Sequence, residues 1–487
     1  MTSEEPDPRR WHALWVTLGV GFMSLLDVSI VNVALPSMQI GLDASAGAVQ
    51  WVVSGYALAF GLTLVAGGRL GDALGRRTIF MISLAGFVLT SALAGAAPSI
   101  ELLILARLLQ GASAGMLTPQ SSGLIQSMFS GAERGKAFGL LGATIGISTA
   151  VGPVLGGLII AAFGTESGWR WVFYVNVPIG VVAMIFAARF LPREERRGIN
   201  VRSEIDFLGA VLLGLAVVCV LFPVVQLEGG GQWWLLVLLP VAGVLGYLFV
   251  RWEHRTVQEG RAPLLDIRLF TSTPGFASGA AIGAVYFCGF AGIFVVLAMF
   301  FQTGLHYTAL ESGLAVTSFA LGSSVSAAIA GRLVARWGRR ITVTALSVVI
   351  LGMAAAGVVG LLVPADQAGL WMSIPLLVAG IGGGAVISPN VTLTLENVPV
   401  RMAGAAGGAM QTGQRIGTAV GAALLVAAFH IGSNAANGRY QVGLAVALGV
   451  AVLIVTVALL LAIRELRDHK TCTVDENLSQ SSVISRQ

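Results

Sequence analysis

Residues 68–77 read Gly-Arg-Leu-Gly-Asp-Ala-Leu-Gly-Arg-Arg and form a short charged segment between two long apolar runs. A second copy, Gly-Arg-Leu-Val-Ala-Arg-Trp-Gly-Arg-Arg, occupies residues 331–340, which is 263 positions later. The copies match in six of ten positions, and both lie between apolar runs. Repetition in equivalent contexts indicates a chain made of two related halves. The alternative is that any short loop between apolar helices attracts Gly and Arg.

The composition excludes an ordinary soluble protein. Residues of the set AVILMFWYC make up 56% of the 487 residues, and charged residues make up only 11%. The charges cluster and leave apolar runs of about 20 residues, the length that crosses a hydrocarbon core of about 30 Å. Many of the 63 Gly residues are then explained by close helix packing, because small residues are enriched where membrane helices touch.

Polar breaks divide the sequence into fourteen apolar spans, and we predict that each is a transmembrane helix. The distance of 263 positions between the two copies makes the second and third spans correspond to the tenth and eleventh. Six helices therefore belong to each half, and the seventh and eighth form an inserted pair. The predicted spans are 13–35, 48–68, 78–97, 101–126, 137–163, 170–190, 206–226, 233–251, 275–301, 312–333, 341–363, 370–395, 403–431 and 440–463.

The predicted fold class is all-α: a polytopic membrane protein of two six-helix bundles with an inserted helix pair. The N-terminal bundle is expected at 13–192 and the C-terminal bundle at 274–464. The linker at 193–273 carries the inserted pair. A cytoplasmic tail is expected at 1–12, and a disordered cytoplasmic tail at 465–487. The first apolar run is too long for a signal peptide and has no small-residue cleavage site, so we interpret it as the first helix.

The distribution of positive charge predicts the orientation. With the N-terminus in the cytoplasm, all but four of the 29 Lys and Arg residues fall in the tails, the cytoplasmic connections or the adjoining helix ends. The exceptions are Arg107, Arg170, Arg415 and Arg439. Such a bias predicts a multi-pass plasma-membrane protein with both termini in the cytoplasm. The net charge of +5 is then a signal of topology, and we expect no nucleic-acid partner.

Cysteine and histidine residues give no sign of a catalytic or metal site. Cys219 and Cys288 fall in apolar spans and Cys472 in the C-terminal tail, so they form no disulfide framework. The five His residues are scattered near span ends or in polar segments. We therefore expect no metal and no cofactor, and an intramembrane enzyme or a sensor is disfavoured.

Asp27 is the one acidic residue of 24 that falls well inside a predicted span. An acid at that depth costs roughly 2.5–3.5 kcal/mol on insertion scales, and such residues usually mark a proton or substrate path. We predict that Asp27 exchanges the proton that drives the protein. The alternative is a structural Asp that is hydrogen-bonded to a neighbouring helix.

Arg107 lies inside the fourth span, and Arg415 is a similar but weaker candidate in the thirteenth. A buried guanidinium stays charged, so it needs an internal partner or a water-filled cavity. We predict that Arg107 faces the same cavity as Asp27 and tunes its protonation. The alternative is a cation near a helix end that reaches the membrane surface.

The fifth span carries small residues at helical spacing from Gly142 onward and ends in a Gly-Pro motif. Small residues permit close backbone contact, and a proline removes a backbone hydrogen bond and permits a bend. We predict that this helix is a hinge at the seam between the halves, although ordinary small-residue packing is an equal alternative on physical grounds. The hinge residues are Gly152, Pro153, Gly156 and Gly157.

The segment quoted first is predicted to be a cytoplasmic latch. Asp72 and Arg76 stand four residues apart, so they can pair across one helical turn or dock on a neighbouring helix end. In the second copy Ala335 replaces the Asp, so the two halves cannot perform the same task there. The predicted latch residues are Gly68, Asp72, Gly75, Arg76 and Arg77.

Polar and aromatic residues within the spans are candidates for a substrate cavity, although hydrogen bonding in the core explains each about as well. These candidates are Asn32, Tyr56, Gln302, Gln411 and Arg415. With one deep acid and two buried arginines, we expect a neutral, zwitterionic or anionic amphiphile rather than a dication. The residues do not name the substrate, because such cavities are apolar with few directional groups.

These motifs together resemble the major facilitator superfamily, and in particular its fourteen-helix drug:proton antiporters, over nearly the whole chain. The segment 68–77 resembles the superfamily's loop signature, and the residues around Arg107 and Gly111 resemble its fourth-helix motif. Residues 148–157 resemble the antiporter motif of the fifth helix. Residues 26–36 and 169–178 resemble signatures of the fourteen-helix branch.

The resemblance implies proton-driven export by alternating access, with the loop signature stabilising one conformation and the Arg of the fourth helix linked to proton transfer. Two residues depart from the pattern. Ser148 replaces the first Gly of the antiporter motif, a change between small residues that we expect to be mild. Ala73 replaces an Arg often found after the loop Asp, which removes one latch partner.

The sequence therefore predicts proton-coupled efflux of an amphipathic drug, antibiotic or metabolite by a monomer whose partners are its substrate, protons and the lipid bilayer. The alternative is a proton-coupled uptake symporter on the same fold. The Gly-Pro motif disfavours that alternative by resemblance alone. The Arg-rich, Lys-poor set of cations and the abundant Ala and Gly suggest a bacterial chain.

Overall fold

The computed structural model describes residues 9–192, 206–228, 233–364 and 367–484. Within these ranges the secondary structure is helical and contains no strand. Fourteen helices of the described chain are long and apolar enough to cross a membrane. The predicted fold class is therefore confirmed. Most of the predicted N-terminal tail and most of the link before the inserted pair lie outside the described residues.

The first half consists of helices that pack on one another around α4 and α1. α1 packs on α5 and α7, α2 packs on α4, and α3 packs on α4 and α7. The predicted sixth span is divided at Val175 into two helices. The elements are α1 (Arg10–Gly41), α2 (Ala46–Leu74), α3 (Arg76–Ala96), α4 (Ile100–Met128), α5 (Gly131–Phe163), α6 (Gly168–Tyr174) and α7 (Asn176–Phe190).

The second half has a corresponding packing order. α14 and α15 pack on α16, and α12 packs on α17 and α18. Its first span begins as an α-helix and ends in the π-helical turn η2. The elements are α12 (Phe276–Phe290), α13 (Gly292–Ala298), η2 (Met299–Gly304), α14 (Ala309–Trp337), α15 (Arg339–Leu362), α16 (Ala368–Thr394), η3 (Val400–Met402), α17 (Ala403–Ala435) and α18 (Tyr440–Ile484).

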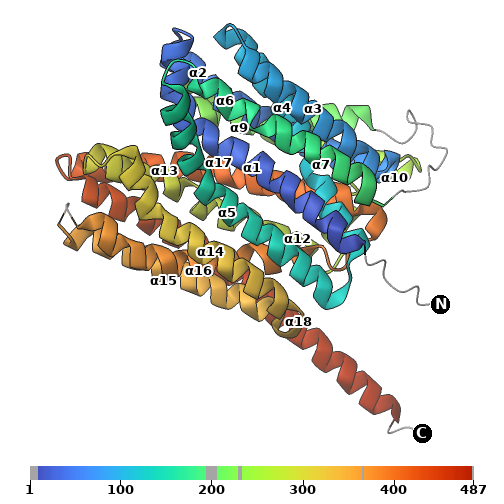
Figure 1. The fold of residues 1–487 in the computed structure, drawn as a ribbon. Coiled ribbons are helices and arrows are strands. Elements are labelled where there is room, and N and C mark those ends of the chain that lie inside the picture. Colours follow the sequence, from blue (N-terminus) through green and yellow to red (C-terminus); the bar gives the residue numbers. More distant parts are fainter. Residues whose placement is uncertain (1–8, 193–205, 229–232, 365–366, 485–487) are drawn as a thin grey trace.

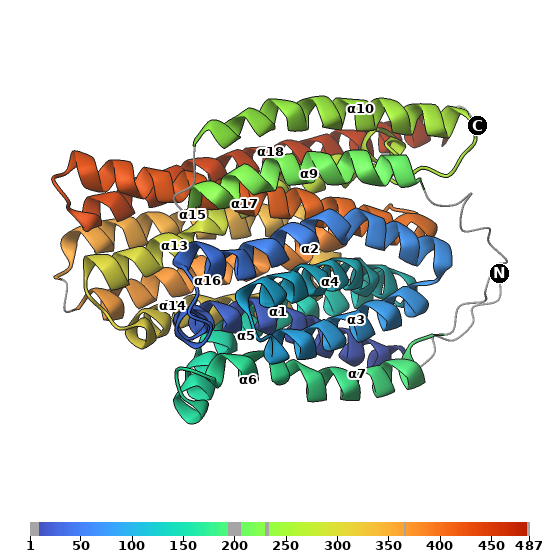
Figure 2. The ribbon, with the colours of Figure 1, turned by 90° about the horizontal axis from the view of Figure 1, so that it is seen from above.

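The inserted pair lies on the outside of the molecule. α9 packs on α2 and α17, and α10 packs on α9. Figure 2 shows α10 as the outermost helix beside α9. The pair therefore covers one seam between the halves, where α2 meets α17. Its elements, with the short helix that follows, are α9 (Phe207–Glu228), η1 (Trp233–Val237), α10 (Leu238–Gln258) and α11 (Arg268–Ser272).

The halves meet along two helix pairs, α5 with α14 and α2 with α17. Figure 1 shows the first seam, with α5 beside α14 between the two groups of helices. Backbones touch there: a methyl group added to Gly331 of α14 would lie 2.4 Å from the carbonyl oxygen of Gly135 and 2.5 Å from the Cα of Gly139. Such an approach requires residues without a side chain.

We call the end of the bundle where α2 joins α3 and α14 joins α15 the basic end, because both copies of the repeated segment lie there. At each joint the chain turns at a glycine with positive φ, 97° at Gly75 and 52° at Gly338. Residues with a Cβ rarely adopt this conformation, which explains why both copies keep this glycine.

The C-terminal helix differs from the prediction. α18 continues to Ile484, beyond the predicted end of its span at residue 463 (Figure 1). Glu465, placed in a disordered tail by the sequence, is 8% exposed and forms an ion pair with Arg339 at 2.7 Å. Polarity marks where a span leaves the apolar layer, whereas a helix ends at a breaker such as Gly or Pro. Neither residue occurs between 450 and 484.

We predict that Gly331→Ala destabilises the protein, because its methyl group would overlap backbone atoms of α5. Overpacking of this kind costs about 1–3 kcal/mol. Thermal unfolding of the purified protein in detergent measures the effect. The matched control is Gly157→Ala on α5, where an added methyl group meets nothing within 4 Å. Equal unfolding temperatures for the two variants would show that the α5–α14 seam is not closely packed.

Candidate functional site

Asp27 lies in the middle of α1 with no exposed surface. Three side chains donate hydrogen bonds to its carboxylate. Arg107 Nη1 lies 2.6 Å from Oδ2, whereas Asn176 Nδ2 and Gln110 Nε2 lie 2.8 and 3.1 Å from Oδ1. The donors come from α4 and α7. A buried carboxylate is tolerated only with such partners, because it has lost its hydration.

Arg107 is 1% exposed and makes two further hydrogen bonds inside the protein. Its Nε donates to the backbone oxygen of Val52 at 3.1 Å, and Nη1 donates to Gln110 Oε1 at 2.8 Å. The guanidinium stacks over the ring of Tyr56 at 4.1 Å. Arg107 therefore does not extend to the membrane surface, and the predicted proximity of Arg107 and Asp27 is a direct contact.

Asn176 extends this network towards α3. Its Nδ2 also lies 3.1 Å from Ser91 Oγ, which in turn donates to the backbone oxygen of Phe173 at 3.0 Å. We call Asp27, Arg107, Gln110, Asn176 and Ser91 the Asp27 cluster. Gln110, Asn176 and Ser91 were not predicted from the sequence. The available signal was that uncharged polar residues stand inside otherwise apolar spans, but this signal does not say which of them face one another.

The chemistry available to the Asp27 cluster is proton binding. Uptake of a proton by Asp27 removes the charge that compensates Arg107, and the guanidinium is then buried without an anion. That state is unfavourable unless Arg107 moves, finds another anion or meets water. A proton on Asp27 would therefore favour a different position of the Arg107 side chain, which belongs to α4.

Two of the predicted cavity residues lie close together between the halves. The Arg415 guanidinium of α17 lies 4.5 Å from the centre of the Phe60 ring on α2. Phe60 in turn stacks with Tyr56 at 6.1 Å between ring centres. A cation and two aromatic rings therefore follow one another from α17 to Arg107.

The other cavity candidates are more dispersed. Asn32 is exposed on α1, and Gln411 is half-buried on α17, one turn before Arg415. Gln302 lies in η2, where its Nε2 is 3.5 Å from Ser312 Oγ. η2 packs mainly on α13, α14 and α18, whereas Tyr56 and Arg415 belong to α2 and α17.

The predicted latch contains both contacts that its sequence suggested. Asp72 pairs with Arg76 Nη2 at 3.0 Å. Its carboxylate also accepts the backbone N–H groups of Gly404 and Ala405 at 3.1 and 2.9 Å. These are the second and third residues of α17, and the residue before that helix, Met402, supplies no cap of its own. Asp72 therefore caps a helix of the opposite half.

Neighbouring groups complete this junction. Arg76 Nη1 donates to the backbone oxygen of Gly123 at 2.8 Å, and its Nη2 donates to that of Val400 in the other half. Gly68 lies against Gly404, where a Cβ would lie 2.2 Å from the carbonyl oxygen. Arg77 instead binds within its own half, to the backbone oxygen of Ala188 at 2.5 Å. We call the contacts of Asp72 and Arg76 with α17 and η3 the interhelical cap.

Gln126, which the sequence analysis did not select, adds a further link between the halves at the basic end. Its Nε2 donates to the backbone oxygens of Leu395 and Val398 at 2.5 and 3.1 Å. The halves are therefore joined at the basic end by polar contacts from both α2 and α4.

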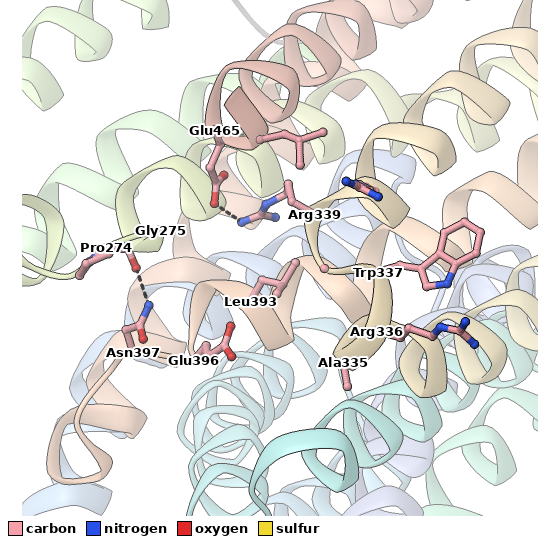
Figure 3. Close-up of a pocket in the computed structure, with 13 residues that line it drawn as sticks. Pro274, Gly275, Ala335, Arg336, Trp337, Arg339, Leu393, Glu396, Asn397 and Glu465 are labelled. Carbon is pink, nitrogen blue, oxygen red and sulfur yellow. Dashed lines mark hydrogen bonds and ion pairs between the residues drawn. The ribbon is translucent and has the colours of Figure 1, made fainter. Parts of the chain in front are cut away.

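The second copy of the repeat has a different partner. Arg339 binds Glu465 and Asn390 Oδ1, each at 2.7 Å, so a carboxylate from α18 replaces the Asp that is missing at Ala335. Figure 3 shows this ion pair at a cavity of about 430 Å³, which is also lined by Glu396 and Asn397. All these contacts lie within the second half. The repeat thus joins the halves in its first copy and stabilises one half in its second.

The Gly-Pro motif of α5 packs mainly on α1. A Cβ on Gly152 would lie 2.4 Å from Ser29, and one on Gly156 would lie 3.0 Å from Ile30. Gly157 faces open space, and Pro153 stands inside a continuous helix. α5 does lie at the seam between the halves, but through residues that precede the motif. The motif itself holds the helical turn that follows Asp27.

The structure buries more acids than the sequence analysis assumed. Asp206, Glu253 and Glu465 are at most 9% exposed, and the Asp72 side chain is fully buried. All four lie towards the basic end. The sequence placed them in loops, tails or helix ends, and composition cannot show that a connection or a neighbouring helix covers such an end.

Sequence comparison identifies relatives of this chain. The model of the Major Facilitator Superfamily matches residues 17–422 and 279–473. The puromycin resistance protein pur8 of Streptomyces alboniger is 36% identical, with 99% of this chain and 96% of that protein aligned. The probable actinorhodin transporter of Streptomyces coelicolor is also 36% identical, over 89% and 75%. The tetracenomycin C resistance and export protein of Streptomyces glaucescens is 30% identical, over 86% and 75%.

Solved structures share the fold. The human organic anion transporter MFSD10 superposes with a TM-score of 0.65 at 16% identity and covers 94% of this chain. The proton:xylose symporter XylE also gives 0.65, at 14% identity and 93% coverage. The family match spans most of the chain, and the helix packing agrees with it. The chain therefore belongs to the Major Facilitator Superfamily of membrane transporters and is not an enzyme.

Proposed function

We propose that this transporter exports an amphipathic small molecule in exchange for protons across the plasma membrane, with its basic end and both termini in the cytoplasm. Three relatives support export: one is named a probable actinorhodin transporter, one a puromycin resistance protein and one a tetracenomycin C resistance and export protein. The distribution of Lys and Arg supports the orientation.

The observation that carries the proposal is the contact of Asp27 with Arg107 inside the Asp27 cluster. Asp27 is fully buried, and its one ion-pair partner belongs to another helix. Binding and release of one proton there changes which arrangement of α1 and α4 is stable. A substrate whose binding stabilises the Asp27–Arg107 ion pair would favour the ionised carboxylate and therefore release of that proton, which is the coupling that exchange requires.

The interhelical cap supports the conformational part of the proposal. It holds α2 against the first turn of α17, and the structure is closed at the basic end by the contacts of Asp72, Arg76 and Gln126. A cap of this kind contributes about 0.5–2 kcal/mol. That is enough to bias an equilibrium between two arrangements and small enough to be broken in each cycle.

The substrate class follows from the charges near the seam. Arg107 is neutralised by Asp27, whereas Arg415 faces aromatic rings and contributes a positive charge between the halves. We therefore propose neutral, zwitterionic or anionic amphiphiles with an aromatic part. Uptake by symport on the same fold is the alternative, because the proton:xylose symporter shares this fold.

An efflux experiment tests the direction of transport. Cells that express the protein are loaded with puromycin, tetracenomycin C or a fluorescent amphipathic dye, and accumulation is compared with that of cells lacking it. We expect lower accumulation, which a proton uncoupler restores. Accumulation that rises on expression would establish uptake, and export that is insensitive to the uncoupler would exclude proton coupling.

We predict that Asp27→Asn abolishes proton-coupled efflux without loss of the folded protein, because Asn cannot bind and release the proton. Proton movement into proteoliposomes on addition of substrate is the measurement. Asp43→Asn, an exposed position after α1, is the matched control. Wild-type coupling in Asp27→Asn would remove Asp27 from the mechanism.

We predict that Asp72→Ala slows turnover more than it weakens substrate binding, since Asp72 contacts α17 and not the region around Arg107. Binding to the purified protein and initial rates in proteoliposomes separate the two effects. Glu133→Gln, which breaks an ion pair with Arg10 inside one half, serves as control. Weaker binding with unchanged turnover of bound substrate would contradict a role in the conformational change.

A further inference from the structure

Two acidic side chains of the inserted helix pair lie side by side at the basic end. Asp206 immediately precedes α9, and Glu253 lies in the last part of α10. A Cβ built on Gly209 would lie 2.5 Å from Asp206 Oδ2 and 2.8 Å from Glu253 Oε1. The two oxygens therefore lie no farther apart than the sum of these distances. Asp206 is 9% exposed and Glu253 is fully buried.

The two carboxylates differ in the hydrogen bonds that they accept. Asp206 accepts hydrogen bonds from Trp252 Nε1 at 2.8 and 3.0 Å and from the N–H of Gly209 at 2.8 Å. Glu253 is held by backbone N–H groups alone, those of Leu264, at 3.2 Å from Oε1, and Leu265, and within the described residues its buried Oε2 has no close hydrogen-bond partner. A proton on Oε2 would turn this unsatisfied acceptor into a donor beside Asp206.

The charges around Glu253 also favour a bound proton. The charged groups that act on it are Asp206 and Arg69 of α2. Within the described part of the chain, one cation beside two carboxylates leaves a net negative charge in a buried place. Two carboxylates that share such a site do not both ionise readily, and the pair retains a proton.

We propose that Asp206 and Glu253 form a proton-binding site that holds one proton between them, separate from Asp27. This inference does not rest on the proposed function. The site would exist whether the protein exports or imports, and whether or not Asp27 couples transport to protons.

The site is placed to influence the interhelical cap. Glu253 holds the backbone of Leu264, which belongs to the connection 259–267 between α10 and α11. Leu264 and its neighbour Leu265 are buried in one apolar cluster with Ala405 of α17. Ala405 also donates its backbone N–H to the carboxylate of Asp72 in a hydrogen bond. The connection and the helix end to which the cap binds therefore share one apolar cluster.

The direction of the pH effect follows from linkage. The proton binds more tightly when the two carboxylates are held together, so the arrangement seen here is favoured while the proton is bound. As the pH rises and the proton leaves, the two charges repel and the connection loosens from α17. The closed arrangement is thus stabilised at low pH and weakened at high pH.

Hydrogen exchange of the wild-type protein in nanodiscs tests this consequence without any variant. We expect amides of the connection 259–267 to lose protection as the pH rises, after correction for the intrinsic pH dependence of exchange. Protection that does not change with pH would overturn the proposal.

Infrared difference titration tests the proton itself. A band from a protonated carboxyl group should titrate in the wild type, disappear in Glu253→Gln and in Asp206→Asn, and persist in Asp27→Asn. Glu259→Gln, an exposed acid of the same connection, is the matched control and should keep the band. Loss of the band only in Asp27→Asn, or a band unchanged in both pair variants, would refute the site. Should one pair variant not fold, the other decides.

Discussion

The carboxylate of Asp72 at the start of α17 is the contact on which the arrangement of the two halves depends. A helix needs partners for its first N–H groups, and here the partner belongs to the other half of the molecule. The contact is possible only because Gly68 lets α2 approach α17 and Gly75 turns the chain directly after it. One decapeptide, residues 68–77, therefore supplies the close helix approach, the turn and the contact between the halves.

Asp27 and Asp72 have complementary places in this scheme. Asp27 lies among α1, α4 and α7, where a proton changes the charge balance inside the first half. Asp72 lies between the halves. It can bind or release the start of α17 without a change in its own charge. The aromatic path from Arg107 through Tyr56 and Phe60 to Arg415 crosses the seam and reaches α17, the helix that Asp72 caps. In the function that we propose, proton binding and movement of the halves are thus served by different residues on contacting helices.

The fold could be predicted from the sequence because apolar length and the repeated decapeptide are strong, local signals. The Asp27–Arg107 proximity was also predictable, since two opposite charges inside the membrane have few other partners. Asn176, Gln126 and Glu465 could not be predicted with their partners, because a single uncharged amide or a terminal acid carries no pairing information. The burial of Asp206 and Glu253 was not predicted for a related reason. Residues of a connection help to bury them, and burial by a connection leaves no periodic pattern in the sequence.

The distance between the halves at the basic end tests the central claim most directly. Spin labels are attached at Thr78→Cys on α3 and Arg340→Cys on α15, both exposed, in a variant without native cysteines. Pulsed electron paramagnetic resonance then measures the distance between the two labels. The interhelical cap predicts a predominantly short distance with Asp72 present and a larger population of long distances with Asp72→Ala. Identical distance distributions with and without Asp72 would contradict the account.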